Sequence, residues 1–480
     1  MAKKKVTFNI DKKGNFSEWF SEIVKEAELA DLRYNIKGFV VFMPWSVLAM
    51  EQMYKFYEKS LQDKGHLPLF MPSLIPESNL KKEASHVKGF TPEVFWVESA
   101  GSGEKFEERY ALRPTSETAF YQMYSQWIRS YNDLPFKRYQ RAQVWRCEGK
   151  ATRPFIRSRE FYWIEAHNAF ASLKDAEKQV AEDMKITKEV MHDIFGIPFI
   201  FFRRPEYDKF AGAVYTFAAD GLMPDGKIIQ LPSTHLLGQN FSKPFDVKFK
   251  DKDGTEKYAF ITCYGPAISR IFASLISTHG DNFGLVFPFK VAPYQIVITP
   301  VVNNKKIMSF VNKIKKNLGE FRVVVDDSDK RIGEKFYYWE MKGVPLRIEV
   351  GEKEIKKNEV VLFRRDLRKR MNVKVKNLLK IVEKEGKNLS KSLILKADKE
   401  FKNSIVNIKS FDDIMKFKGK IARANFCSIG KDGEECAARI EKEALASVRG
   451  TRVDKREKAT GKCIVCGKKA KEVVYIAKSY

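Results

Sequence analysis

Two short stretches carry arginine and glutamate at spacings that suit the binding of an anion. Arg146-Cys147-Glu148 is an Arg-x-Glu triplet, and Arg157-Ser158-Arg159-Glu160-Phe161 follows it after a polar loop. Successive residues of a strand point to opposite faces, so the triplet puts Arg146 and Glu148 on one face. An arginine on a buried face needs an anion, and a nearby glutamate accepts from an amine or a guanidinium. The triplet therefore indicates an anion site, although a salt bridge on a sheet surface would use the same residues.

Four of the six cysteines gather near the C-terminus, at Cys427, Cys436, Cys463 and Cys466. The last two form Cys-x-x-Cys, a good half-site for a metal, whereas the first two are spaced more widely than is usual. Clustered thiols in a cytosolic chain indicate a metal rather than disulfides, with free thiols as the alternative. Four thiolates leave no open position, so a bound Zn²⁺ would be structural.

The elements that position the arginines belong to a first region, residues 1–288. A helix is expected over Phe16–Leu32, and a second helix, marked by Met50, Tyr54, Tyr57 and Leu61, ends at Gly65. A short strand should follow over 67–72. Further strands are expected at Lys137–Cys147, Phe161–His167, Gly226–Leu231 and Tyr258–Tyr264. Strands crowded with Arg and Glu suggest an antiparallel sheet with one functional face.

Two smaller regions follow. Residues 289–390 alternate strand and helix, with strands at 294–302, 321–326, 346–350 and 360–365, a helix at 305–318 and a basic helix near 372–386, which implies a small α/β domain. Residues 391–480 are rich in lysine and hold the cysteine cluster, as a small α+β domain.

Charge and hydropathy favour a protein that binds an anionic polymer and argue against a membrane or secreted protein. The 480 residues contain 87 Lys and Arg against 61 Asp and Glu, a net charge of +26. Such a surface favours an anionic polymer such as a nucleic acid, unless the whole proteome is rich in lysine. No apolar run is long enough for a membrane span, and no apolar stretch follows the basic N-terminus as in a secretory signal. A cytoplasmic protein is expected.

The arginine-rich stretches resemble two motifs of the class II aminoacyl-tRNA synthetases. Residues 146–161 resemble motif 2, in which two antiparallel strands flank a loop over ATP. Thr262–Arg270 resembles motif 3, which supplies an arginine near a helix N-terminus. The helix and strand that end at Gly65 and Pro72 resemble motif 1, which builds the homodimer interface. The resemblance thus implies an antiparallel catalytic core and a homodimer.

The same resemblance assigns roles around ATP. Arg146 would hold the α-phosphate, Glu148 the adenine amino group, Phe161 the adenine ring and Arg270 the γ-phosphate, while Arg157 also faces ATP. Arg146 and Arg270 are the candidate catalytic residues, because charge builds on the α-phosphate in the transition state. The ATP set is completed by Ser158, Gln230 and Ser233. Mg²⁺ would bridge the phosphates.

Four further segments resemble the prolyl-tRNA synthetases of the archaeal/eukaryotic type. They are Leu112-Arg113-Pro114-Thr115-Ser116-Glu117, Phe161–His167, Lys209–Ala213 and Gln230–Phe241, and they occur in the family's order. One departure is Ser233-Thr234, where the family has Thr-Ser, but both hydroxyls are kept.

Proline presents a secondary ammonium, a carboxylate and an apolar ring, so its pocket needs an anion, a cation and an apolar wall. The resemblance places eight residues there: Thr115, Glu117, Arg146, Trp163, Glu165, His167, Phe210 and His235. Glu117 and Thr115 suit the ammonium, Arg146 the carboxylate, and Trp163 and Phe210 the ring. Glu165 and His167 are two residues apart in a strand and share a face. Either histidine, by itself, could instead be a hydrogen-bonded core residue.

The two smaller regions resemble the anticodon-binding domain and the C-terminal zinc-binding domain of the same family. Glu340, Arg347 and Lys353 are expected to read the two guanines of a proline anticodon, because Arg and Lys commonly bind guanine edges. A solvated charged strand is the alternative. Between Phe170 and Tyr258 there is no room for the large editing insertion of bacterial-type prolyl enzymes.

The expected activity is that of a proline–tRNA ligase, which activates L-proline with ATP and transfers it to the 3′ end of the proline tRNA. Positioning and charge stabilisation, rather than a protein nucleophile, would supply most of the catalysis. Two rivals remain. A threonyl enzyme would need a catalytic zinc trio, and none surrounds Cys147. A non-catalytic RNA-binding paralogue should have lost Arg146, Glu148 or Arg270.

Overall fold

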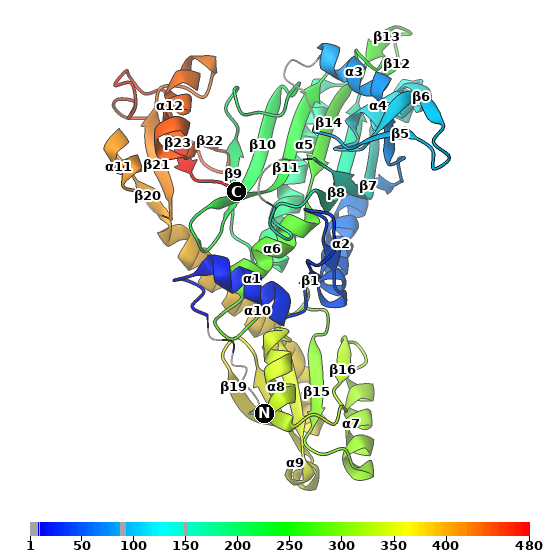
Figure 1. Ribbon diagram of the computed structural model, residues 1–480, viewed down its shortest axis with the longest axis vertical. Helices are drawn as coiled ribbons and strands as arrows, with labels where there is room; N and C mark the ends of the chain where they lie inside the picture. Colours follow the sequence, from blue (N-terminus) through cyan, green and yellow to red (C-terminus); the bar gives the residue numbers. More distant parts are fainter. Residues whose placement is uncertain (1–7, 9, 87–92, 148–151, 418) are drawn as a thin grey trace.

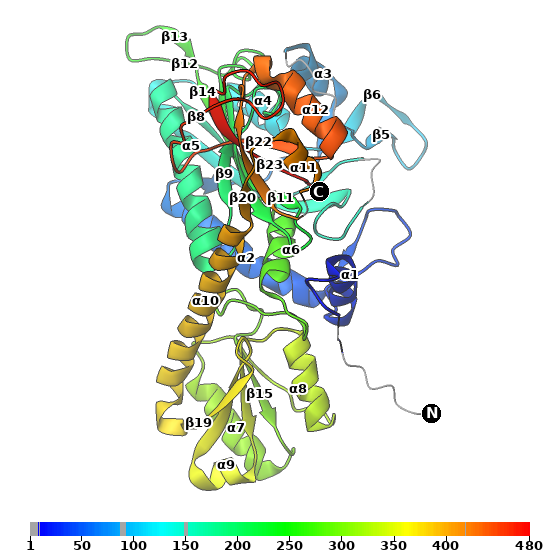
Figure 2. The same cartoon turned by 90° about the vertical axis from the view of Figure 1, so that its left-hand side faces the viewer.

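The computed structural model describes residue 8 and residues 10–86, 93–147, 152–417 and 419–480. A large N-terminal part occupies one end of the molecule, a small α/β part the other end, and the C-terminal part lies beside the large sheet (Figure 1). The long helix α10 (Leu378–Asn403) runs from the small part to the C-terminal part (Figure 2). The boundary expected at residues 390 and 391 falls inside this continuous helix.

The N-terminal part is built on an antiparallel sheet, as expected. Its strands have the order β9-β10-β11-β14-β8-β7-β3, in which only β3 pairs in parallel. Their bounds are β3 (Leu67–Pro68), β7 (Phe136–Trp145), β8 (Glu160–Phe170), β9 (Ile200–Arg203), β10 (Tyr215–Leu222), β11 (Ile228–Gly238) and β14 (Phe260–Gly265). The four longer strands expected from the sequence correspond to β7, β8, β11 and β14.

Smaller strands surround this sheet. β1 (Ala30–Asp31) pairs with β2 (Val41–Phe42), and β12 (Lys248–Lys250) with β13 (Glu256–Tyr258). A separate sheet has the order β4 (Leu74–Pro76), β6 (Lys105–Leu112), β5 (Trp96–Ser99).

Helices cover the sheet and bury its apolar residues. They are α1 (Phe16–Glu26), α2 (Pro44–Asp63), α3 (Glu77–His86), α4 (Glu117–Trp127), α5 (Leu173–Thr187) with its π-helical continuation (Lys188–Ile194), and α6 (Ile268–His279), together with a 3₁₀ turn (Tyr131–Asp133). The largest apolar core joins α1, α2 and α6 to the sheet. Ser172 caps α5 by accepting a hydrogen bond from the Asp175 amide, a typical N-cap.

Two expectations for this part were wrong in their bounds. The first helix ends at Glu26 rather than Leu32, because Glu28 has a φ of +50° and the chain then pairs as β1. The strand expected over 67–72 is only two residues long, and Pro68 and Pro72 have no amide hydrogen for a ladder.

The small part is the expected α/β domain. Its sheet has the order β16 (Val323–Val325), β15 (Ile296–Pro300), β17 (Leu346–Val350), β18 (Glu359–Arg364), β19 (Lys369–Lys374). Its helices are α7 (Lys305–Asn317), α8 (Ile332–Met341) and α9 (Glu352–Lys357), and a 3₁₀ turn (Val375–Asn377) leads into α10. The basic helix expected near 372–386 was wrong at its start, because residues 369–374 pair with β18 as a strand.

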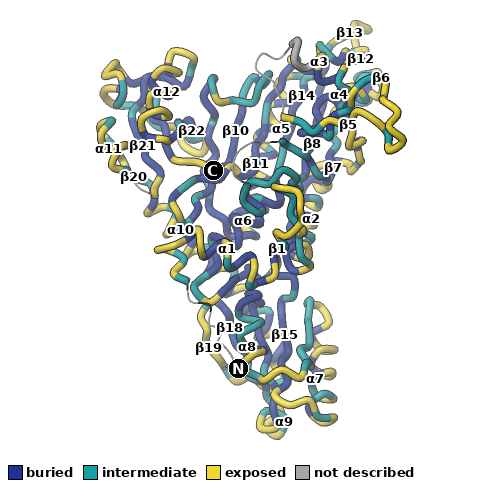
Figure 3. Tube along the Cα trace, viewed as in Figure 1, coloured by how far each residue is buried: buried dark blue, intermediate teal, exposed yellow. Residues whose placement is uncertain are grey.

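The C-terminal part extends the large sheet. Its strands β20 (Ile405–Asn407), β21 (Ile421–Phe426), β23 (Glu472–Ala477) and β22 (Ser447–Arg452) follow in that order, and β22 pairs with β9. Its helices are α11 (Phe411–Met415) and α12 (Glu434–Ala444), with a 3₁₀ turn (Lys431–Gly433) before α12. The strands of the joined sheet are mostly buried, whereas the β5–β6 hairpin and α9 are exposed (Figure 3). Within the described ranges, no helix has both the length and the apolar character to cross a membrane.

Candidate active site

A pocket of about 610 Å³ opens over the central sheet, beside the start of α6. Thirteen of the residues assigned to ATP or proline line it: Thr115, Glu117, Arg146, Arg157, Phe161, Trp163, Glu165, His167, Phe210, Gln230, Ser233, His235 and Arg270. They come from stretches that are far apart in the chain. The antiparallel register brings them together, because β8, β14 and β11 are neighbours.

The arginines Arg146 and Arg270 reach this pocket from two directions. Arg146 follows β7, where its amide donates to the Arg159 carbonyl at 2.8 Å, and its guanidinium lies 5.2 Å from the Phe161 ring centre. Arg270 lies in the first turn of α6, and its Nε donates to the Ile156 carbonyl at 3.1 Å. Two guanidinium groups beside a helix N-terminus form a site suited to phosphates.

The pocket also has an acidic group of lining residues. Glu117 begins α4, and the Thr115 hydroxyl donates to its carboxylate. Glu165 accepts from Ser116 and, at 2.6 Å, from Gln140, while its second oxygen lies 3.2 Å from His167 Nε2. Burial opposes ionisation of Glu165, but these hydrogen bonds outweigh it and hold its pKa below the usual value. The carboxylate of Glu117, that of Glu165 and the His167 imidazole lie close enough together to hold one cation.

The two histidines are both buried and both hydrogen-bonded. His167 Nδ1 lies 2.9 Å from the Tyr121 hydroxyl, and its ring stacks on Phe120. His235 lies 2.9 Å from the Thr216 hydroxyl and 3.0 Å from that of Ser233. Burial, with a smaller contribution from the charge of Arg204, lowers the pKa of His235 to about 3. His235 is therefore neutral at physiological pH.

Aromatic side chains also line the pocket. Trp163 meets Phe161 edge to face at 5.8 Å, and Phe210 lies 4.8 Å from the His235 ring. Within the described residues, the buried Trp163 Nε1 has no hydrogen-bond partner. A buried N–H without a partner is uncommon, which is consistent with a donor that faces a ligand.

The other two residues assigned to ATP are Glu148 and Ser158. Glu148 lies outside the described residues. Ser158 is not among the lining side chains, and its hydroxyl donates to the Glu160 carbonyl at 2.6 Å within its own turn.

Sequence reasoning missed several lining residues, among them Glu93, Arg204, Asp208, Thr216 and Cys263. Asp208 directly precedes Lys209–Ala213 and Arg204 lies five positions before Lys209, so extending that segment backwards would have found them. Burial and the nearby Glu117 and Glu165 raise the pKa of Cys263 well above its usual value, which leaves this thiol protonated.

The three residues expected to read an anticodon lie in the small α/β part. Arg347 is buried in β17 between the rings of Phe336 and Phe363, and it donates to Glu349 at 2.9 Å. Glu340 Oε1 lies 3.6 Å from Arg347 Nη1. Lys353 stands on the exposed face of α9, and among the described residues its side chain shares no hydrogen bond or ion pair with either. The alternative of a solvated charged strand is therefore wrong for Arg347, which is only 2% exposed.

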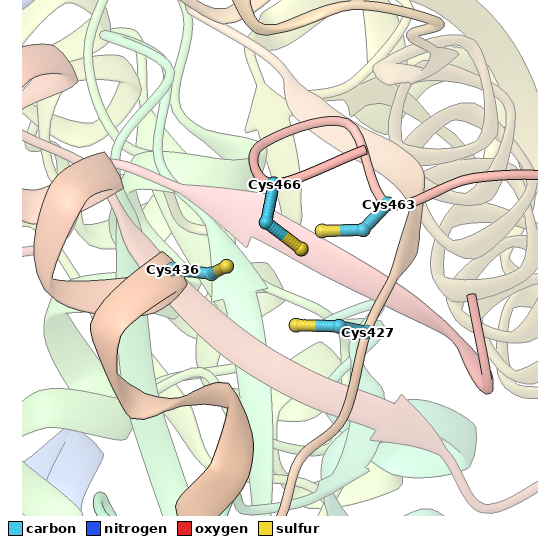
Figure 4. A group of neighbouring side chains, drawn as sticks. All are labelled: Cys427, Cys436, Cys463 and Cys466. Carbon is cyan, nitrogen blue, oxygen red and sulfur yellow. The ribbon is translucent and has the colours of Figure 1, made fainter. Parts of the chain in front are cut away.

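The four cysteines of the C-terminal part converge on one point (Figure 4). Their sulfur atoms all lie within 4.8 Å of one another. Cys427 directly follows β21, Cys436 comes from α12, and Cys463 and Cys466 come from the turn before β23. The wide spacing of Cys427 and Cys436 is accommodated because the chain turns through Lys431–Gly433 between β21 and the first turn of α12. Four thiols around one centre are the donor set that tetrahedral Zn²⁺ prefers.

Family models match three consecutive parts of the chain. They are described as the tRNA synthetase class II core domain (G, H, P, S and T), residues 95–279; an anticodon binding domain, residues 295–385; and the prolyl-tRNA synthetase C-terminal domain, residues 408–480.

Relatives match over nearly the whole length. The proline–tRNA ligase of Thermofilum pendens is 46% identical over 98% of this chain and 98% of its own, and that of Methanopyrus kandleri is 40% identical over 97% and 96%. A solved prolyl-tRNA synthetase of Giardia lamblia, in complex with prolyl-adenylate, is 37% identical with a TM-score of 0.93 and covers 99% of this chain and 100% of that one. One from Cryptosporidium parvum, complexed with L-proline and AMP, is 32% identical with a TM-score of 0.91 and covers 100% and 99%.

The three family models, in this order, and the full-length relatives thus indicate the same kind of enzyme. These matches exclude the threonyl enzyme and the non-catalytic paralogue. This chain therefore belongs to the class II prolyl-tRNA synthetases, the ATP-dependent ligases that join proline to tRNA.

Proposed function

We propose that the pocket binds ATP and L-proline side by side, with the phosphates at its basic end and the proline ammonium at its acidic end. The observation that carries this proposal is the convergence of Arg146, Arg157 and Arg270 with Glu117 and Glu165 around one cavity. Arginine forks match phosphate oxygens, whereas paired carboxylates favour a cation. One cavity thus offers complementary charge to both substrates.

The adenosine half of ATP would lie against the strand residues near Phe161. Its ring stacks the adenine, and Gln230 and Ser233 face the ribose and the reacting centre. Arg146 binds the α-phosphate and Arg270 the γ-phosphate, since the two guanidiniums approach from the sheet and from α6. Glu148 and Ser158 remain candidates from the family pattern alone. Mg²⁺ bound with ATP would neutralise phosphate charge.

The proline half would lie between Trp163 and Phe210. Glu117 and Thr115 bind the ammonium, and Glu165 and His167 complete the anionic side. The neutral His235 closes the pocket without adding a charge that would repel the ammonium. This arrangement favours a small cyclic substrate with one positive charge, because the walls are aromatic and the acidic groups are buried.

The reaction then follows from positioning. A proline carboxylate oxygen attacks the α-phosphorus, the bond to the β-phosphate breaks, and pyrophosphate leaves. Arg146 stabilises the charge that builds on the α-phosphate oxygens. In the second step the terminal ribose hydroxyl of tRNA attacks the prolyl carbonyl, and AMP leaves. No side chain needs to form a bond to the substrate.

The proline anticodon would bind at Glu340, Arg347 and Lys353. The aromatic rings around Arg347 fix the plane of its guanidinium, which suits bidentate contact with a guanine edge. Arg347 must then exchange part of its contact with Glu349 for the base. The domains would span 1–288, 289–390 and 391–480, and each range contains one of the family models, although the last boundary falls within α10.

The cysteine cluster would hold a structural Zn²⁺ through Cys427, Cys436, Cys463 and Cys466. Bound there, the ion would cross-link β21, α12 and the turn before β23, and it would take no part in the reaction. The protein would work in the cytoplasm, where translation occurs. It would form a homodimer through α2 and the edge of the sheet at β3, where Leu67 of β3 and Phe70 just after it present apolar surface.

The deciding experiment is amino-acid-dependent ATP–pyrophosphate exchange over a panel of amino acids. Proline should support exchange, and Arg146→Ala should reduce it by about 100-fold or more, as for other lost transition-state contacts. Glu117→Ala should abolish activation of proline while ATP still binds. Unchanged proline activation in Glu117→Ala would remove the proposed orientation of proline.

A further inference from the structure

The C-terminal part contributes a buried arginine to the wall behind the substrate pocket. Arg449 lies in β22, Asp220 in β10, and Arg204 directly after β9. Their exposed fractions are 7%, 0% and 3%. Two guanidiniums and one carboxylate are thus held out of water where two domains meet, and none of the three was assigned a role above.

The Asp220 carboxylate binds both arginines. Arg204 donates to its two oxygens at 2.9 and 2.7 Å, and Arg449 donates to the same oxygens at 2.9 and 3.3 Å. Arg204 Nη1 also donates to the Arg449 carbonyl at 3.0 Å. Burial opposes ionisation of Asp220, but the two guanidiniums outweigh it and keep its pKa below the usual value. The Asp220 carboxylate is therefore charged, and each of its oxygens accepts a hydrogen bond from both arginines.

Arg204 connects this network to the pocket. It is one of the lining residues, and its Nη2 donates to Gln230 Oε1 at 3.2 Å. Gln230 is the direct cross-strand neighbour of Asp220, and it too lines the pocket. The Arg204 charge also contributes to the neutrality of His235. The orientation of Arg204 therefore determines the surroundings of two proposed substrate contacts.

The domain contact that presents Arg449 is close and specific. β22 pairs with β9 through Thr451 and Arg452, and the Glu206 amide donates to the Ile429 carbonyl at 2.8 Å. Gly450 has a φ of +114°, and a Cβ there would lie 1.9 Å from the Arg203 carbonyl oxygen. Only glycine allows this approach, so the backbone beside Arg449 is held firmly against β9.

Removing Arg449 would leave Asp220 with one partner instead of two. Asp220 could then turn with Arg204, because among the described residues Arg449 is the side chain of the C-terminal part that holds this carboxylate. The second acid near these arginines is Asp208, which lines the pocket and attracts both guanidiniums. A released Arg204 would turn towards Asp208 and away from Gln230.

We propose that Arg449 is a positioning residue for ATP binding: it holds Asp220, and through Asp220 it holds Arg204 in the orientation that fixes the Gln230 amide. The C-terminal domain thereby completes the ATP side of a pocket that it does not itself line. This inference rests on the proposed assignment of Gln230 to ATP.

The first test compares Arg449→Met with Arg449→Lys and with Arg452→Met. Arg452 lies on the same strand, but its guanidinium pairs with Asp454, so it controls for loss of charge at this interface. In pyrophosphate exchange, Arg449→Met should raise the KM for ATP by about tenfold, the scale of one charge-assisted hydrogen bond, with kcat changed less than about twofold. Arg449→Lys should recover part of the loss, and Arg452→Met should resemble the wild type.

A merely structural role for Arg449 predicts a different result. It would lower the melting temperature and the amount of active protein, with the KM for ATP unchanged, and that result would overturn the proposal. Zinc content should equal that of the wild type in all three variants, because Arg449 is not a thiol ligand. Loss of zinc from Arg449→Met would also count against the proposed positioning role of Arg449.

A double-mutant cycle separates this proposal from the assignment on which it rests. If Gln230→Ala alone leaves the KM for ATP unchanged, the assignment of Gln230 fails, whatever Arg449 does. If Gln230→Ala raises the KM, adding Arg449→Met should raise it little further, because both changes remove the same contact. Fully additive effects would show that Arg449 does not act through Gln230.

Discussion

His167 Nε2 lies 3.2 Å from the Glu165 carboxylate, and both side chains are almost completely buried beneath the substrate pocket. The imidazole orients this carboxylate and favours its charged form. Because two residues on one strand face share the pocket, the contact follows from strand geometry. It places a fixed negative charge where the proposed proline ammonium binds.

We therefore expect Glu165→Gln to raise the KM for proline by about tenfold or more, since it removes a buried charge opposite the ammonium. The KM for ATP should change little. Pyrophosphate exchange at varied proline and varied ATP measures both quantities. Glu160→Gln, at the start of the same strand, is the matched control. Equal changes in both KM values would contradict this role for Glu165.

Asp183 should make stability depend on pH. It lies on α5 behind the pocket, where it accepts from Gln179 and from Thr234, the neighbour of His235, both at 2.7 Å. Burial raises its pKa from 3.8 to about 7. Between these values the unfolded chain ionises while the folded chain stays protonated, so this residue's contribution to stability falls as pH rises from about 4 to 7 and then levels off.

Asp183→Asn should remove that dependence. Within the window, the free energy of unfolding of the variant relative to the wild type should increase by up to roughly 1.4 kcal/mol per pH unit. Denaturant unfolding at several pH values between 4.5 and 8 measures the difference. A constant difference across this range would show that Asp183 titrates alike in both states.

Metal removal should weaken the C-terminal domain. A strong chelator or Cys436→Ser should lower its melting temperature, because the proposed zinc joins segments that have no other covalent link. Purified wild-type protein should contain about one zinc per chain by atomic absorption, as four thiolates bind a single ion. Cys147→Ser, outside the cluster, should retain the metal. A zinc-free wild type with an unchanged melting temperature would remove the metal assignment.

The proposed dimer should depend on the exposed apolar residues beside β3. Phe70 is 82% exposed, and Leu67 is 55% exposed at the edge of the large sheet. Phe70→Glu would bury a charge in the interface, so we expect it to shift the protein from dimer to monomer. Sedimentation at several concentrations measures this shift. Phe106→Glu, on the exposed β5–β6 hairpin, tests whether another apolar site has the same effect. A wild type that is monomeric at every concentration would refute the dimer.

The sequence by itself determined the chemistry and the local elements. Strand periodicity was enough to place Glu165 and His167 on one face. The motif 2 and motif 3 segments were enough to expect the antiparallel core, the alternation of strand and helix patterns predicted the α/β domain, and the grouping of four cysteines predicted a thiol cluster. These features depend on neighbouring residues or on short segments, so they can be read directly along the chain.

Only the tertiary structure decided which distant residues meet. Asp220 and Arg449 are 229 positions apart, and the sequence pattern around neither residue predicts their contact. The pairing of β22 with β9, the return of Cys436 towards Cys427 and the inward turn of Arg347 are likewise results of packing. Such contacts depend on how whole sheets and helices pack together. An unpaired buried charge costs free energy, so a buried charged group pairs with an opposite charge that the fold places beside it, however distant in the sequence.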